Sequence, residues 1–253
     1  MVSIPFLEFY ITNVCNLQCR GCNRFNNYNF KGHFAWNDAY EEWAKKLDVE
    51  VISILGGEPT AHPQLEEWCI NLRRLWPNSK IFVQSNGTLI KLRKMRLWEK
   101  YEVGTVISLH DRETAADIRN KWPHLTMDNG YIFHQAALIP DGDGFKPHES
   151  DPETAYNTCA SKENITMLNG KLYRCPVVAI LPEFQKQFNV KMDARQQAVL
   201  DSYTALPADC TDEEIKEFLK PRVLKQCEFC PSKLEWRYAL GDDDSVVDPP
   251  GFS

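Results

Sequence analysis

Short strand-like segments alternate with longer helix-like segments along the first 140 residues of the chain. The strand-like runs are rich in β-branched and aromatic residues, and the helix-like runs repeat apolar residues every three or four positions. The predicted strands are residues 6–12, 49–55, 80–84, 103–109 and 131–139, and the predicted helices between them are residues 37–47, 64–75, 89–101 and 113–121. Such alternation requires right-handed crossovers, so we predict an α/β fold with a mainly parallel sheet, either open and doubly wound or closed into a full or partial barrel.

The sequence changes character after about residue 140. Residues 141–152 are polar and rich in turn-forming residues, which predicts a linker. Beyond them, Asn169-Gly170 is typical of a two-residue hairpin turn, and Thr211 with Glu214 predicts a capping box at the start of a helix. We therefore predict one domain over residues 1–140, a linker over 141–152, a second domain over 153–240 and an acidic, Pro-rich, poorly ordered tail over 241–253.

Charge and hydropathy limit the classes of partner. The 253 residues carry a formal net charge of -6, which argues against a broad binding face for duplex nucleic acid. The N-terminal residues do not resemble a secretory signal, and no apolar run reaches the roughly 18 residues needed to cross a bilayer. We therefore expect a cytoplasmic protein without membrane contact. Its thiols are then reduced, so clustered cysteines indicate metal binding or catalysis rather than disulfides.

The first cysteine cluster follows the first predicted strand directly. Cys15, Cys19 and Cys22 are separated by three and then two residues. Three thiolates at this spacing can hold three corners of one iron-sulfur cluster, whereas a structural zinc ion needs a fourth ligand. His33, or more remotely Asp38, could supply that fourth ligand. The spacing favours iron and sulfur, and the zinc alternative stays open at this point.

Polar segments also follow the next three predicted strands, where the carboxyl ends of a parallel sheet collect functional residues. They are Gly56-Gly57-Glu58-Pro59 after the second strand, Ser85-Asn86 after the third, and Ser108 with His110 at the end of the fourth. Ordinary turns are the alternative for the first two segments, and a structural histidine is the alternative for His110. Their common position predicts a site at this edge of the sheet.

The CxxxCxxC and Gly-Gly-Glu-Pro motifs together resemble those of the radical S-adenosylmethionine (SAM) superfamily. The resemblance implies a partial (β/α)6 barrel and a 4Fe-4S cluster held by Cys15, Cys19 and Cys22, with SAM chelated to the free iron. Electron transfer from the reduced cluster would cleave SAM to methionine and a 5'-deoxyadenosyl radical. The implied SAM contacts are Gly56, Gly57, Glu58, Pro59, Ser85, Asn86 and Ser108, with Glu58 accepting a hydrogen bond from the SAM ammonium group and the two glycines allowing close approach.

One position departs from the pattern of the superfamily. An aromatic residue often precedes the third cysteine and packs near the adenine ring, but this chain has Gly21 there. Adenine contacts must then come from elsewhere in the chain. Phe25 and Phe30 are the candidates that the sequence offers.

The second half of the chain contains a further set of cysteines. Cys159 and Cys175 flank the predicted hairpin, and Cys227 and Cys230 form a CxxC pair. Four thiolates suffice for a closed zinc or iron-sulfur site. The spacing also resembles the twitch domain of radical SAM enzymes, a small α+β domain with one auxiliary 4Fe-4S cluster. Cys69 lies on the apolar face of a helix and is interpreted as structural. Cys210 could replace one of the four ligands, but its position directly before the predicted capping box favours a structural role.

The resemblance implies a radical SAM enzyme, and an oxidoreductase is the reaction class that we favour. We expect hydrogen abstraction from a small molecule or peptide, a two-electron oxidation with the auxiliary cluster as electron acceptor, and reduction by a flavodoxin or ferredoxin. His110 and Arg174 are the candidate catalytic side chains, and His134 and Gln135 are further candidates for substitution. The alternatives are a radical SAM enzyme for rearrangement, carbon-carbon bond formation or activation of a glycyl-radical partner, and a zinc-stabilised binding module without catalysis.

Overall fold

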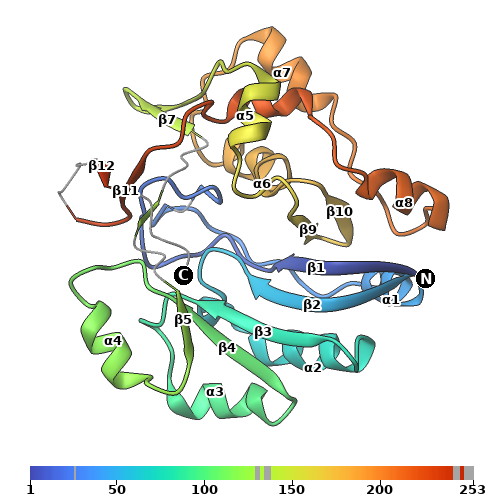
Figure 1. Cartoon of the computed structure of the whole chain (residues 1–253), viewed down its shortest axis with the longest axis vertical. Coiled ribbons are helices and arrows are strands. Elements are labelled where there is room, and N and C mark those ends of the chain that lie inside the picture. Colours follow the sequence, from blue (N-terminus) through green and yellow to red (C-terminus); the bar gives the residue numbers. More distant parts are fainter. Residues whose placement is uncertain (26, 129–131, 134–137, 242–245, 248–253) are drawn as a thin grey trace.

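A seven-stranded sheet forms the centre of the molecule in the computed structural model (Figure 1). The structure describes residues 1–25, 27–128, 132–133, 138–241 and 246–247. The strand order is β10-β9-β1-β2-β3-β4-β5, in which β1 to β5 are parallel, β9 is parallel to β1, and β10 is antiparallel to β9. The strands are β1 (Val2–Tyr10), β2 (Leu47–Leu55), β3 (Lys80–Ser85), β4 (Val103–Ser108), β5 (Thr126–Asp128), β9 (Ile165–Leu168) and β10 (Lys171–Tyr173). The mainly parallel α/β sheet is confirmed.

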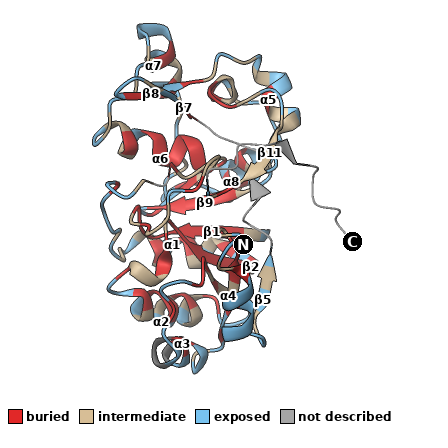
Figure 2. Ribbon diagram, turned by 90° about the vertical axis from the view of Figure 1, so that its left-hand side faces the viewer, coloured by how far each residue is buried: buried red, intermediate tan, exposed pale blue. Residues whose placement is uncertain are grey.

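The helices divide between the two sides of this sheet. α1 (Ala39–Lys46), α2 (Leu65–Leu75), α3 (Leu92–Glu99) and α4 (Ala115–Lys121) connect β1 to β5 in order, whereas α5 (Pro152–Thr158), α6 (Pro176–Gln185) and α7 (Ala194–Asp201) lie on the opposite side of β1 from α2 and α3 (Figures 1 and 2). α8 (Asp212–Leu219) begins at Thr211, whose side chain and that of Glu214 form the predicted capping box. None of the helices in the described ranges is long and apolar enough to cross a membrane.

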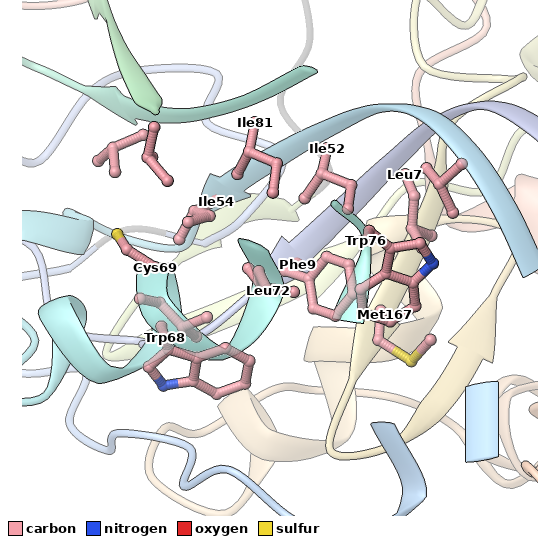
Figure 3. Packing of buried hydrophobic residues seen from close by; sticks show 14 of the residues in the cluster. Leu7, Phe9, Ile52, Ile54, Trp68, Cys69, Leu72, Trp76, Ile81 and Met167 are labelled. Carbon is pink, nitrogen blue, oxygen red and sulfur yellow. The ribbon is translucent and has the colours of Figure 1, made fainter. Parts of the chain in front are cut away.

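Two apolar clusters fix the sheet from its two faces. On one face, Phe9 of β1 packs edge-on against Trp68 and Trp76 beside α2, with ring centroids 6.4 and 5.5 Å apart (Figure 3). Cys69 is fully buried in this cluster, as predicted. On the other face, Tyr10 belongs to a second cluster that contains Phe184 of α6. Since successive side chains of a strand point to opposite faces, β1 contributes to both clusters.

The C-terminal half joins the central sheet through the predicted hairpin. Asn169 and Gly170 have positive φ angles of 48° and 74°, as a two-residue turn between antiparallel strands requires. The indole of Trp43 on α1 donates a hydrogen bond to the carbonyl oxygen of Gly170 at 2.8 Å. A Cβ atom at Gly170 would lie 2.6 Å from the Cβ of Ala39, so this close contact requires glycine.

Several predicted elements differ in the structure. The strand predicted at 131–139 is wrong, because the fifth strand of the sheet is the three-residue β5, and the described residues 132–133 form β6 (Ile132–Phe133) of a small sheet with β11 (Trp236–Tyr238) and β12 (Val246–Val247). The sixth parallel strand of the sheet is β9. It does not follow β5 at that edge of the sheet but pairs with β1, on the side of β1 opposite to β2. The predicted linker contains β8 (Gly144–Pro147), which forms a hairpin with β7 (Leu138–Asp141). The predicted tail at 241–253 lies mostly outside the described residues.

Candidate active-site cavity

A cavity of about 430 Å³ opens at the carboxyl ends of the parallel strands. Its walls come from the loops after β1, β2 and β3, from the end of β4 and from β5, together with two residues of β1 and one residue that precedes β9. The polar and sulfur-containing residues that line it are Glu8, Cys15, Cys19, Cys22, Asn23, Arg24, Glu58, Gln84, Ser85, Asn86, Ser108, His110, Asp128 and Asn164. The edge of the sheet predicted from the sequence therefore carries a hollow with many charged and polar groups.

The three cysteines of the first cluster all line this cavity. Cys15 and Cys19 are 6% and 8% exposed. Burial raises the pKa of the Cys15 thiol to about 12, and it raises the pKa of Cys19 as well, since a thiolate is poorly solvated there. Neutral thiols in such a place become thiolates when a metal cation compensates their charge. The donor set and its burial therefore fit a metal cluster rather than a solvent-exposed reactive cysteine.

The Gly-Gly-Glu segment is bound to the cysteine loop through the backbone. The amide of Gly57 donates to the carbonyl oxygen of Thr12 at 2.7 Å, and the amide of Glu58 donates to that of Val14 at 2.8 Å. A Cβ atom would lie 2.5 Å from the oxygen of Thr12 at Gly56 and 2.5 Å from that of Val14 at Gly57. The two glycines also line the cavity. From the sequence we expected them to allow close approach of SAM, whereas their tightest contacts in the structure are with the backbone of the cysteine loop, which passes against the end of β2.

We expect Gly57→Ala to destabilise the protein by about 1–3 kcal/mol, because the added methyl group forces the cysteine loop away from β2. For a domain of this size that corresponds to a decrease in Tm of roughly 2–12 °C, measurable by thermal denaturation monitored by circular dichroism. Gly104→Ala is the matched control, since a Cβ atom there would lie no closer than 3.8 Å to its neighbours. An unchanged Tm for Gly57→Ala would contradict the close contact between the two loops.

Glu58 lies at the centre of a buried hydrogen-bond network. Its side chain is 1% exposed, and its Oε1 accepts hydrogen bonds from the Ser85 hydroxyl at 2.7 Å and from the amide and hydroxyl of Thr60. Its Oε2 accepts one from the Asn86 amide at 2.8 Å. Burial raises the pKa of this carboxyl group although these donors favour its ionised form. Pro59 starts the short 3-10 turn Pro59–Ala61 that carries Thr60.

Asn86 joins the loop after β3 to the cysteine loop. Its Nδ2 donates to Oδ1 of Asn16 at 2.9 Å, and its Oδ1 accepts from the amide of Thr88 at 3.0 Å. Asn16 directly follows Cys15. The Gly56–Pro59 segment and the Ser85-Asn86 segment are therefore both hydrogen-bonded to the loop that carries the cysteines. Ser85 and Asn86 are 2% and 4% exposed. Their side chains are held in place by the protein and are not the free turn residues of the alternative interpretation.

A second chain of hydrogen bonds crosses the ends of β2 to β5. The Ser53 hydroxyl donates to Gln84 at 3.3 Å, Gln84 donates to the Ser108 hydroxyl at 2.9 Å, and Ser108 donates to Oδ2 of Asp128 at 3.0 Å. Gln84, Ser108 and Asp128 line the cavity, as does His110. Asp128 was not singled out from the sequence, because the three-residue β5 has too few residues to show a strand pattern.

The interior face of β1 adds an ion pair that sequence reasoning also missed. Arg24 donates to Oε1 of Glu8 at 2.8 Å, and the two side chains are 17% and 5% exposed. Asn164 donates to the same carboxylate oxygen at 2.9 Å, and the Thr166 hydroxyl donates to Oε2 at 3.2 Å. Glu8 could have been noticed as a charged residue inside an apolar strand pattern, and Arg24 as a residue next to the CxxxCxxC motif.

Three candidates from the sequence have structural positions away from the cavity. Arg174 is 4% exposed, donates to the carbonyl oxygen of Phe218 at the end of α8, and is not among the described residues that line the cavity. Phe30 is fully buried and packs against Phe184, with ring centroids 5.1 Å apart, so it offers no face to an adenine ring. Phe25 also packs in this cluster, although it lines a neighbouring apolar cavity.

The two residues considered as a fourth zinc ligand for the first cluster have other contacts or positions in the structure. His33 is hydrogen-bonded through Nδ1 to the Thr12 hydroxyl at 2.8 Å, and Asp38 precedes α1 as its N-cap. Across the part of the chain that the structure describes, no three Cys, His, Asp or Glu side chains gather as ligands of a single metal ion. His134 and Gln135, the further candidates, lie outside the described residues.

Three cysteines of the second set come from different segments and interact electrostatically. Cys159 ends α5, Cys175 precedes α6, and Cys227 lies in the 3-10 turn Lys225–Phe229, with Cys230 directly after it. Burial is the largest cause that raises the pKa of Cys175 to about 12, and the charges of Cys159 and Cys227 contribute to this rise, so these three thiols are electrostatic neighbours. Cys210 stands apart, where its carbonyl oxygen accepts a hydrogen bond from Lys46.

The N-terminal part of the chain is similar to known proteins. Residues 9–117 match the family model described as the Radical SAM superfamily. The chain is 33% identical over 84 residues to an S-adenosylmethionine-dependent nucleotide dehydratase of a Thermoplasmatales archaeon (strain ISO4-H5), covering 33% of this chain and 29% of that protein. It is 31% identical over 113 residues to the GTP 3',8-cyclase of Aquifex aeolicus (strain VF5), covering 42% and 35%. The matches therefore span about a third of the length of these relatives.

A solved structure resembles almost the whole chain. The crystal structure of BtrN in complex with AdoMet and 2-DOIA, a 2-deoxy-scyllo-inosamine dehydrogenase, aligns with a TM-score of 0.52 over 89% of this chain and 92% of that one. The sequence identity is 12%, so the likeness concerns the fold alone. The layout of the cysteines in the sequence also resembles that of this dehydrogenase. The expected radical SAM fold is thereby confirmed.

Proposed function

We propose that this chain, which carries a radical SAM domain over residues 9–117, is an enzyme that cleaves SAM reductively and abstracts a hydrogen atom from a small-molecule or peptide substrate. The observation that carries the proposal is a single cavity lined by Cys15, Cys19 and Cys22 on one wall and by Glu58 and Ser85 on another. Three thiols that line one cavity, two of them buried, suit a cluster with one open iron, and a buried carboxylate suits a cationic ligand beside it.

The residues would share the work as follows. When bound, a 4Fe-4S cluster and SAM supply the electron and the 5'-deoxyadenosyl radical that abstracts hydrogen. Cys15, Cys19 and Cys22 would hold the cluster. The residues that would hold SAM are Gly56, Gly57, Glu58, Pro59, Ser85, Asn86 and Ser108.

Glu58 is prepared for a cationic group by its surroundings. Ser85, Asn86 and Thr60 fix both carboxylate oxygens, so the side chain keeps one orientation. Since burial opposes the charge of Glu58, an ammonium group close to it would lower the pKa of the carboxyl group and bind with a charge-assisted hydrogen bond. Ser85 is then a positioning residue that acts through Glu58.

For the net reaction we favour a two-electron oxidation. Hydrogen abstraction leaves a carbon radical on the substrate, and loss of one electron and one proton completes the oxidation. Cys159, Cys175, Cys227 and Cys230 would hold a second 4Fe-4S cluster as the electron acceptor, within an auxiliary twitch-type domain over residues 153–240. His110 lines the cavity, where it would accept the proton. A flavodoxin or ferredoxin would supply the electron for SAM cleavage.

A different reaction on the same radical is the second candidate. The two curated relatives are named as a dehydratase and a cyclase, and their names describe no net oxidation. Rearrangement, carbon-carbon bond formation and glycyl-radical activation therefore remain alternatives. The composition of the product separates them: a two-electron oxidation removes two hydrogen atoms from the substrate, whereas a rearrangement leaves its mass unchanged, and mass spectrometry measures the difference.

Anaerobic reconstitution with iron and sulfide tests the proposed function. We expect roughly eight irons per chain, the number in two 4Fe-4S clusters, and 5'-deoxyadenosine after SAM and dithionite are added. Iron quantification and chromatography of the nucleoside measure the two quantities. Bound zinc without SAM cleavage would instead identify a zinc-stabilised binding module.

The same preparation tests the second cluster. Cys159→Ala is expected to lower the iron content by up to about half, while Cys210→Ala leaves it unchanged. An unchanged iron content in Cys159→Ala would remove the auxiliary cluster from the proposal and leave the SAM-binding cluster in place.

A further inference from the structure

Two buried hydrogen-bond donors beside the first cysteine cluster have no acceptor. Among the described residues, the buried side-chain polar atoms without a hydrogen-bond partner are the hydroxyl of Tyr10, Oδ1 of Asn13, Nε of Arg24 and Nε1 of Trp122. Tyr10 and Arg24 interact electrostatically with each other and with Cys22. Buried donors are normally paired, so two unpaired donors at one place indicate a missing acceptor.

Tyr10 lies on the same face of β1 as the two residues of this strand that line the cavity, although Tyr10 itself packs in the apolar cluster beside it. Phe6 and Glu8 line the cavity, and the two-residue period of the strand places Tyr10 on the same face, one step closer to the cysteines. Tyr10 is 1% exposed, and its ring packs beside Phe34 with centroids 6.0 Å apart. The hydroxyl therefore has no access to bulk water, although Cys22 and Cys15 are among its charged neighbours.

The guanidinium of Arg24 is held by its other two nitrogens. Its NH2 group donates to Oε1 of Glu8 at 2.8 Å, and its NH1 group donates to Oδ1 of Asn23 at 2.6 Å. These bonds fix the plane of the guanidinium and leave Nε as a buried donor two residues after Cys22. The Nε–H of Arg24 can only donate, and the Tyr10 hydroxyl can donate as well, so an acceptor next to both groups would satisfy them together.

We propose that the Tyr10 hydroxyl and the Arg24 Nε donate hydrogen bonds to sulfur atoms at the Cys22 corner of the cluster and raise its reduction potential. The proposal rests on the proposed function, since it requires an iron-sulfur cluster at Cys15, Cys19 and Cys22. Thiolate and sulfide sulfur atoms are the anionic acceptors that such a cluster supplies. Because reduction adds negative charge, donors next to the sulfurs stabilise the reduced cluster more than the oxidised one.

The test is the midpoint potential of the cluster in Tyr10→Phe, which removes only the hydroxyl. On the reconstituted full chain without substrate, electron paramagnetic resonance during a redox titration measures the reduced cluster. We expect the ratio of reduced to oxidised cluster at a fixed potential to fall about tenfold, a shift of about 59 mV to more negative values for one electron. Tyr40→Phe is the matched control, since Tyr40 is also 1% exposed but lies on α1 against Trp36 and Phe9.

Arg24→Lys provides an independent measurement. Lysine keeps the positive charge opposite Glu8 but lacks the Nε donor, so we expect a shift in the same direction as in Tyr10→Phe. Midpoint potentials equal to that of the unsubstituted protein in both variants, with iron bound, would overturn the proposal. Failure of the unsubstituted chain to bind iron would instead overturn the proposed function, so the two failures are distinguishable.

Discussion

Replacing Cys15 with alanine is expected to abolish reductive SAM cleavage. Cys15 is one of three thiols on the wall of the cavity, and Leu17 donates its amide to the Cys15 sulfur at 3.4 Å. Two remaining thiols cannot hold three corners of a 4Fe-4S cluster, so the open iron for SAM is lost. The measurement is 5'-deoxyadenosine formed by the anaerobically reconstituted protein with dithionite, which should fall to the level without enzyme.

The matched control is Cys210→Ala, which also removes one buried thiol. Cys210 is 7% exposed, belongs to the apolar cluster with Phe218, and is absent from the cavity lining among the described residues. We expect this variant to form 5'-deoxyadenosine at the rate of the unsubstituted protein. Equal activity of Cys15→Ala and the unsubstituted protein would contradict the assignment of the cavity as the SAM site.

The first four strands of the sheet were predictable because their signals are local. β1 to β4 are apolar runs followed by polar turns, and α1 and α2 repeat apolar residues at helical spacing. β5 has only three residues, which are too few to show a strand pattern, so the fifth strand was predicted at 131–139 instead. The helices α5, α6 and α7 were missed; in α6, residues Pro176 to Pro182 are all apolar, and Pro182 lies inside the helix. Periodicity identifies a helix only when one face stays polar.

The site was predictable where motifs are contiguous and was missed where distant segments meet. The three cysteines of the first cluster, Glu58 and Ser85 lie in short motifs at strand ends, and the structure places all of them around one cavity. Asn164 enters the same cavity only because β9 pairs with β1, a long-range pairing that the sequence does not specify. Arg174, a candidate from the sequence, is instead hydrogen-bonded to Phe218 and does not line the cavity.

The ion pair of Glu8 and Arg24 is expected to contribute strongly to the free energy of unfolding. We expect Arg24→Met to destabilise the metal-free protein by about 3–5 kcal/mol, because removing one partner leaves the Glu8 carboxylate buried without its counter-charge. Asn164 and Thr166 still donate to Glu8, but they carry no charge. Urea denaturation of the metal-free chain, monitored by circular dichroism, measures this loss. Arg74→Met is the control, since Arg74 pairs with Glu41 at the surface with 52% and 38% of the side chains exposed, and its loss should leave the midpoint unchanged.

The double variant Glu8→Gln with Arg24→Met separates the charge from the packing. Glutamine keeps one acceptor oxygen for Asn164, its amide group can donate to the Thr166 hydroxyl, and the buried negative charge is gone, so we expect the double variant to be more stable than Arg24→Met alone. If the two substitutions were simply additive, the pair would contribute little coupling energy and the orientation of Arg24 would depend on packing alone. A large coupling would instead mean that Glu8 fixes the guanidinium, which holds Nε of Arg24 beside Cys22 and connects the stability of β1 to the environment of the cysteine cluster.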